Sequence, residues 1–133
     1  MNTYLTVSVA MLTGIAIGGV AIQGLHAQGK PPVYLITEID VTDPDKYAQE
    51  FAPKAQATVR AAGAKFLIIG GTAGAGAKPI TAMDGTAPKR ITVQVWESTD
   101  ALNNWYNSEA YQAALKIGKQ YAMFRRYAVE GQQ

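Results

Sequence analysis

The stretch PVYLITEIDV, residues 32–41, decides the fold class, because apolar and polar side chains alternate along it. An alternation with a period of two predicts a β-strand, since successive side chains of a strand point to opposite faces of the sheet. Thr37 interrupts an otherwise apolar face that carries Val33, Leu35, Ile39 and Val41. The other face is mixed and carries Tyr34, Ile36, Glu38 and Asp40.

A helix is expected directly after this strand, within residues 42–63. Asp43 is a suitable N-cap, and Pro44 fits the first helical position because its missing N–H has no partner there. Pro53 lies inside the helical pattern and should kink or divide the helix. Gly63 is well placed to end it.

The rest of the chain adds a second helical region and three more strands. KFLIIGG, residues 65–71, predicts a short buried strand, and a Gly-, Ala- and Pro-rich connection with a turn at Asp84–Gly85 follows it. Later segments predict a strand over 90–98, helix over about 99–122 and a closing strand over 123–131. This order predicts an α+β fold of the ferredoxin-like βαββαβ type, a four-stranded antiparallel sheet with helices on one face.

The second helical region contains NNWYNSEAYQ, residues 103–112, with three large rings close together. One continuous helix would leave Trp105, Tyr111 and Leu115 off its apolar face. A break at Asn107–Ser108 removes this difficulty, because Ser108 then caps a new helix. We therefore expect two helical segments whose rings serve mainly in packing.

The N-terminal 27 residues differ from the remainder, since no Asp, Glu, Lys or Arg precedes Lys30. Such an apolar start is typical of an export signal over 1–27, which leaves a mature domain over 28–133. The expected location is periplasmic or secreted. The alternative is an uncleaved anchor in the inner membrane, because residues 5–22 approach the length that spans a bilayer.

The composition excludes several classes of function. The 12 basic residues are scattered and balanced by 10 acidic ones, which argues against a nucleic-acid partner. Cysteine is absent, and the single histidine, His26, lies in the leader. The mature domain therefore cannot form a Cys/His zinc site, a His-ligated haem, a cysteine nucleophile or a Ser–His–Asp triad. We expect no metal and no cofactor.

The ordered segments of the mature chain resemble the bacterial family called domain of unknown function 1330. The resemblance covers nearly all of residues 33–131 and rests on YLITEIDVTDPDKY, AGAKFLIIGG, VQVWES, WYNSEAYQAAL and FRRYAVEG. It implies a dimeric α+β barrel, in which two ferredoxin-like monomers join sheet to sheet. Glu109 stands where the family usually has proline. The wider group includes cofactor-independent monooxygenases, haem enzymes and stress-responsive proteins, so the fold implies no single chemistry.

A homodimer of this kind would cover the helix-free face of the sheet. We expect this face to carry Tyr34, Ile36, Glu38, Thr92, Gln94 and Trp96. A single sheet that exposes Ile36 and Trp96 would present a sizeable apolar patch, and association with a second copy removes it.

Glu38 is the best catalytic candidate, because burial of a mid-strand carboxylate would raise its pKa toward a value useful in a general base. The alternative is an ion pair with Arg90, Arg125 or Arg126. Arg125 and Arg126 point to opposite faces of a strand, so only one of them can join Glu38.

Aromatic residues are the candidates for binding a small, partly apolar molecule, either by stacking on it or by lining its cleft: Tyr34, Trp96, Trp105 and Tyr106. Core packing is the alternative for these rings.

Three functions remain open at this point. The first is an exported homodimer that binds such a molecule between helices and sheet. The second is a cofactor-independent enzyme in which a carboxylate or tyrosine moves a proton on an aromatic or carbonyl substrate. The third is a structural or stress-related dimer without a ligand.

Overall fold

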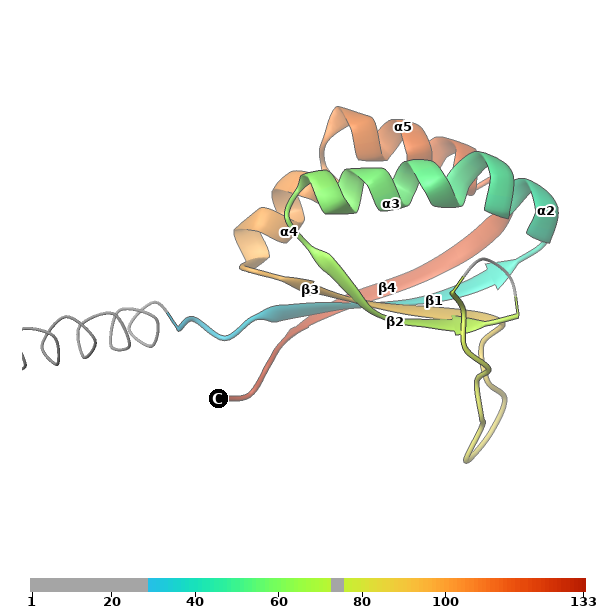
Figure 1. Ribbon diagram of the computed structural model, residues 1–133, viewed down its shortest axis with the longest axis horizontal. Coiled ribbons are helices and arrows are strands. Elements are labelled where there is room, and N and C mark those ends of the chain that lie inside the picture. The colour runs from blue at the N-terminus through green and yellow to red at the C-terminus, as the bar shows by residue number, and fades with distance from the viewer. Residues whose placement is uncertain (1–28, 73–75) are drawn as a thin grey trace, which may run out of the picture. The chain divides into compact units, whose positions relative to one another are not determined.

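The computed structural model describes residues 29–72 and 76–133 (Figure 1). The signal or anchor predicted over 1–27 lies outside these residues. Within the described ranges, no helix is both long enough and apolar enough to cross a membrane.

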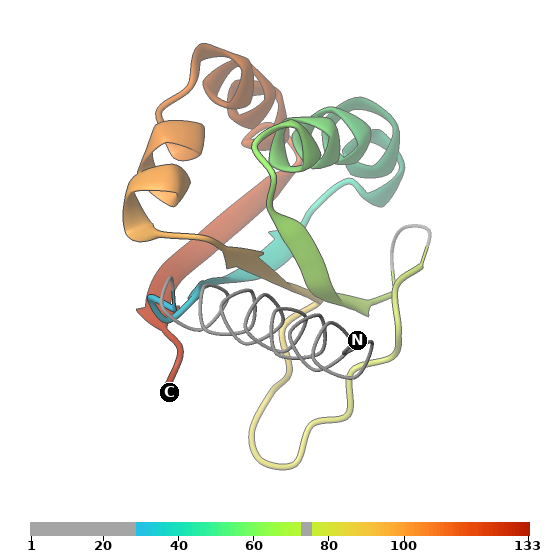
Figure 2. The same ribbon diagram turned by 60° about the vertical axis from the view of Figure 1, so that its left-hand side comes forward.

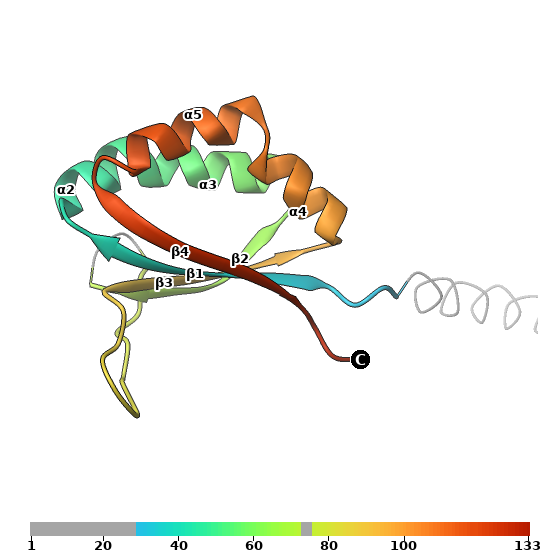
Figure 3. The same ribbon diagram turned by 180° about the vertical axis from the view of Figure 1, so that it is seen from behind.

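Four antiparallel strands form one sheet in the order β2-β3-β1-β4. Their bounds are β1 Val33–Val41, β2 Lys65–Gly71, β3 Arg90–Trp96 and β4 Ala122–Glu130. The helical segments lie together on one face of this sheet (Figures 1 and 3). The predicted ferredoxin-like α+β fold is therefore confirmed.

The first helical region is divided, as the position of Pro53 predicts. It consists of α2 (Pro44–Lys46), a π-helical turn η1 (Tyr47–Phe51) and α3 (Ala52–Ala61), which has Pro53 in its first turn. Asp43 caps the start, since its carboxylate accepts a hydrogen bond from the Lys46 N–H at 3.1 Å. Gly63 follows the end with a φ of 85°, a conformation that glycine adopts without strain.

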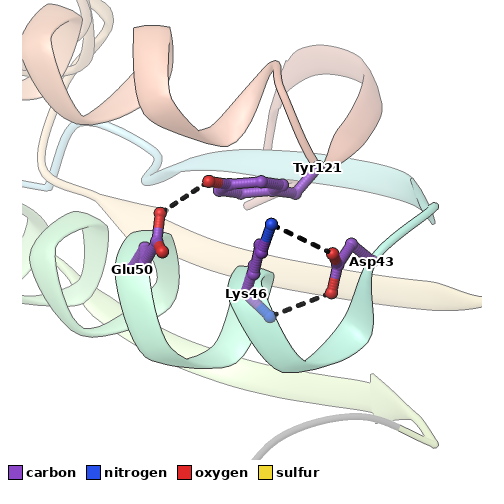
Figure 4. A network of polar contacts seen from close by, with 4 residues as sticks. All are labelled: Asp43, Lys46, Glu50 and Tyr121. Carbon is purple, nitrogen blue, oxygen red and sulfur yellow. Dashed lines mark hydrogen bonds and ion pairs between the residues drawn. The ribbon is translucent and has the colours of Figure 1, made fainter.

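A small polar network joins this region to the turn before β4 (Figure 4). The Tyr121 hydroxyl donates a hydrogen bond to Glu50 Oε2 at 2.6 Å, and Lys46 Nζ lies 5.7 Å from the centre of the Tyr121 ring. The network therefore links η1 with the segment that follows the last helix.

The second helical region is broken at the predicted place. Helix α4 (Thr99–Tyr106) and helix α5 (Glu109–Gly118) are separate, and Ser108 is the N-cap of α5. Its hydroxyl donates to the Trp105 carbonyl at 2.6 Å and accepts from the Tyr111 N–H at 3.2 Å. Figure 2 shows α5 beside α3 over the sheet.

The predicted face assignment of β3 is wrong. Val33 pairs with Trp96 and Leu35 with Gln94, so the row of Trp96, Gln94 and Thr92 lies on the helix-covered face. All three side chains are buried there. The row of Ile91, Val93 and Val95 takes their place on the helix-free face. Alternation shows which residues share a face, but the pairing register with β1 decides which face that is.

Strand β2 also differs from its prediction as a buried strand. It lies at the edge of the sheet, and Leu67 and Ile68 are about half exposed. The register shifts between Phe66 and Ile68, which is the mark of a β-bulge. Only Phe66 of these three packs against the core.

Glu38 lies on the helix-free face, directly opposite Arg125 of β4. Its Oε2 accepts hydrogen bonds from Arg125 Nε at 2.8 Å and from the Tyr127 hydroxyl at 3.3 Å. The hydrogen bond from Arg125 is the main reason why the pKa of Glu38 is lowered from its ordinary value of 4.5. In the single chain, where this face is uncovered, the pKa of Glu38 is thus lowered and not raised, and the ion pair with an arginine that the sequence analysis considered is present.

This lowered pKa predicts a pH-dependent contribution to stability. A carboxyl group whose pKa is lower in the folded state stabilises the fold above the unfolded-state pKa, and the stabilisation is lost as the pH falls through the folded-state pKa. The difference in unfolding free energy between wild type and Glu38→Gln should therefore be largest above about pH 4.5 and shrink below it. Urea unfolding at pH 7 and at more acidic values measures it. An equal difference at every pH would contradict the ion pair.

Candidate functional site

A cavity of about 40 Å³ lies between the helices and the sheet; we call it the interior cavity. This volume accommodates only a few water molecules. Four of the residues that line it are aliphatic, Ile39, Ala52, Ala55 and Val59, and the other twelve are aromatic or polar. The polar and aromatic members are Thr37, Tyr47, Phe51, Gln56, Phe66, Arg90, Thr92, Gln94, Trp105, Tyr111, Phe124 and Arg126.

A larger open groove, of about 640 Å³, lies between α4 and β4; we call it the β4 groove. Tyr106 and Asn103 of α4 line one side, and Ala128 of β4 lines another. Phe124 and Arg126 line both the groove and the interior cavity. These two side chains therefore separate a wide outer space from a narrow inner one.

Trp105 forms part of the cavity wall and is held on three sides. Its ring centre lies 3.9 Å from that of Tyr111 and 4.9 Å from that of Trp96. Its indole N–H donates to Thr58 Oγ1 at 3.0 Å. Trp96 in turn donates its indole N–H to Gln94 Oε1 at 3.0 Å. Both indoles thus bury their rings and keep a hydrogen-bond partner, as buried tryptophans generally require.

Two arginines project from the sheet into the helix-covered layer. The guanidinium carbon of Arg126 lies 4.2 Å from the centre of the Phe124 ring and 5.7 Å from that of Tyr111. The guanidinium carbon of Arg90 lies 5.4 Å from the centre of the Tyr47 ring, and Arg90 is buried. Among the described residues that line the interior cavity and the β4 groove, none is an Asp or Glu. The site is therefore electropositive.

The two tyrosines beside these arginines remain protonated at neutral pH. Burial raises the pKa of Tyr111 to about 12, although the neighbouring Arg126 opposes this shift. Burial likewise raises the pKa of Tyr47, against the effect of Arg90. Both hydroxyl groups therefore stay neutral, and each oxygen lies beside an arginine whose hydrogen bond partly offsets the rise in pKa.

The residues predicted from the sequence as a site do not lie together. Trp105 lines the interior cavity, and Tyr106, which is 36% exposed, lines the β4 groove. Trp96 is 1% exposed and lines neither space. Tyr34 and Glu38 lie on the opposite face of the sheet, so the sheet separates them from the cavity.

The sequence interpretation missed the arginines as site residues, because it considered Arg90 and Arg126 only as partners of Glu38. Arg90 pairs with Ile39 and Arg126 with Thr37, which places both on the face opposite Glu38. The sequence feature that could have indicated the site is Thr37, a polar residue in the otherwise apolar row of β1. Polar residues in register with it, Thr92 and Arg126, form a polar band beneath the helices.

Metal-ligand groups do not gather in the described part of the chain. No three His, Cys, Asp or Glu side chains there are close enough to hold an ion. The groups that line the site are hydrogen-bond donors, amides and rings.

Solved structures with a similar fold include two proteins of differing character. A protein of unknown function from Rhodopseudomonas palustris is 14% identical with a TM-score of 0.56, over 79% of this chain and 85% of that one. SnoaB, a cofactor-independent oxygenase from Streptomyces nogalater, is 13% identical with a TM-score of 0.54, over 78% of this chain and 96% of that one. At these identities the likeness shows the fold alone.

No curated protein matches the chain. The family described as domain of unknown function 1330 matches residues 32–132, nearly the whole described domain, and the chain therefore belongs to this family.

Proposed function

We propose that this protein binds a small, partly apolar molecule between its helices and its sheet. The observation that carries the proposal is that polar and aromatic side chains line the space between helices and sheet. Aliphatic side chains alone would suffice to pack a core there. Thr37, Thr92 and Gln94 are buried in this layer together with Arg90. Such a row places hydrogen-bonding groups beside the apolar and aromatic wall of a cavity, and this combination is typical of small-molecule sites.

The sizes of the two spaces indicate how a ligand would sit. The interior cavity holds only a few waters, whereas the β4 groove is large enough for a molecule with one or two rings. The ligand would occupy the groove and direct one end toward Phe124 and Arg126. Tyr106 offers a partly exposed ring on which an apolar part could stack.

A cofactor-independent enzyme is the second candidate, and the observation that favours it is the buried Tyr111 hydroxyl beside Arg126. A protonated tyrosine at this position can donate a hydrogen bond or a proton to a bound carbonyl oxygen. The carboxylate form of this hypothesis has lost its support. Glu38 is on the wrong face, and its lowered pKa makes it a weaker base.

Binding in the β4 groove predicts saturable uptake of N-phenyl-1-naphthylamine, a neutral dye that fluoresces in apolar surroundings. Ala128→Trp should weaken its affinity by roughly tenfold or more, about 1.4 kcal/mol, because a bulky ring then fills the groove. Ala128 is exposed on an edge strand, so the fold should tolerate the larger side chain. Fluorescence titration measures both affinities.

Ala113→Trp is the matched control for this titration. Ala113 is exposed on α5 and lines neither the groove nor the interior cavity, so its substitution should leave the dye affinity unchanged. No saturable dye binding by the wild-type protein, or equal binding by both variants, would contradict the proposal and leave a dimer without a ligand as the better account.

We further propose that a second copy of this chain covers the helix-free face of the sheet. This face exposes Ile68 at 51%, Met123 at 67%, Tyr127 at 46% and Val129 at 54% of their surfaces. Ile36, Ile91, Val93 and Val95 lie among them in a half-buried state. An apolar patch of this extent is typical of an interaction surface. The Glu38–Arg125 pair within it supplies both a negative and a positive charge, so the same surface of a second copy can complement it in a two-fold contact.

Light scattering after size-exclusion chromatography tests the dimer. The wild-type domain should have twice the chain mass, and the double variant Ile68→Lys, Val129→Lys should have the mass of one chain. Both positions are half exposed within one chain, so lysine should disrupt association and not folding. The monomer mass for the wild type, or the dimer mass for the variant, would overturn this interface.

A further inference from the structure

We infer that the bound molecule carries a negatively charged oxygen group, of the carboxylate or sulfonate type, and that Arg126 holds this group where the β4 groove meets the interior cavity. The inference rests on the proposed function and specifies its ligand class. It goes beyond a partly apolar ligand, because it predicts that a neutral analogue of the same shape binds less tightly.

Among the residues that the structure describes, Arg126 is the one basic side chain that lines both spaces. It projects from β4 beside Thr37 of β1 and lies over the Phe124 ring. Ring faces attract the cation, but a guanidinium has five N–H donors that require acceptor atoms. Within the described residues no carboxylate forms an ion pair with Arg126. A ligand anion can accept two of these hydrogen bonds in parallel.

The surroundings of Arg126 favour a negative charge. Arg90 lines the interior cavity and Lys119 lines the β4 groove, and no described lining residue is acidic. Tyr111 and Tyr47 add hydroxyl groups whose raised pKa values keep them protonated. Donors and positive charge therefore dominate the site, and in a partly buried space their attraction for an anion is stronger than in water.

Arg125 provides a built-in contrast on the same strand. It follows Phe124, precedes Arg126 and points to the opposite face, where Glu38 Oε2 lies 2.8 Å from its Nε. Arg125 is thus paired with a carboxylate of its own chain, Glu38. Arg126 lines a binding space whose described walls contain no carboxylate.

The test compares 8-anilinonaphthalene-1-sulfonate with N-phenyl-1-naphthylamine, which has the same ring system without the sulfonate. Wild-type protein should bind the anionic dye at least about tenfold more tightly, since hydrogen bonds to charged groups are among the strongest in proteins. Arg126→Gln should remove most of this preference, measured as the ratio of the two dye affinities. Arg125→Gln should retain the preference.

Arg126→Lys serves as a second variant, in case the glutamine variant fails to fold. It keeps the charge but cannot form two parallel hydrogen bonds, so we expect a smaller loss of preference than with glutamine. Circular dichroism and urea unfolding check the fold of each variant.

Equal affinity for the two dyes, or a preference that survives in Arg126→Gln, would overturn the anion inference and leave the proposed function standing. A preference that Arg125→Gln abolishes would place the anion on the helix-free face and also overturn it. The absence of saturable binding of either dye would instead overturn the proposed function, and the inference with it.

Discussion

The packing of Trp105 is the interaction on which the rest of the domain depends. One indole contacts Tyr111 of α5 and Trp96 of β3, and it hydrogen-bonds to Thr58 of α3. It thus joins the sheet and three helices at one point. This arrangement requires the break at Ser108, because only then can the rings of α4 and α5 face each other.

Within the described domain, the buried core consists of two clusters, and the interior cavity lies between them. One buried cluster contains Trp96, Trp105 and Tyr111, and the other contains Tyr47 and Phe51. Ala55 and Phe124 pack against both clusters and also line the interior cavity. The polar band of the sheet crosses this region, so the cavity is a consequence of how the two clusters meet.

The approach of α5 to η1 shows how closely the second cluster is packed. A Cβ atom at Gly118 would lie 2.5 Å from Phe51 Cδ2, which is closer than real contacts allow. Glycine therefore lets the helix reach the Phe51 ring, which in turn lies 5.3 Å from the Phe124 ring at the cavity. Packing on this side holds Phe124, and with it the neighbouring Arg126, against the sheet.

Much of the fold could be predicted from local signals in the sequence. Asp43, Pro53, Gly63 and Ser108 each impose a helix start, irregularity or end through their own backbone chemistry, and the structure confirms each. The face of β3 could not be predicted in this way. Both of its rows contain apolar residues, and only the pairing register of Val33 with Trp96 decides which row meets the helices.

The same limit explains why the candidate site was only partly predicted. Trp105 and Tyr106 were identified as rings, but the arginines that give the site its charge depend on the register of two strands with β1. Arg90 and Arg126 are far apart in the sequence. They lie on the same face of the sheet only because β3 pairs Arg90 with Ile39 and β4 pairs Arg126 with Thr37. Glu38 was correctly identified as an unusual mid-strand carboxylate. Its partner, Arg125, lies with it on the helix-free face, so Glu38 does not belong to the candidate site.

A crystal structure of the protein with bound 8-anilinonaphthalene-1-sulfonate would test the central claim most directly, because it locates both the rings and the charge. The account predicts that the rings lie in the β4 groove beside Tyr106 and that the sulfonate contacts the Arg126 guanidinium. Density for the dye on the helix-free face, beside Tyr34 and Arg125, would contradict it.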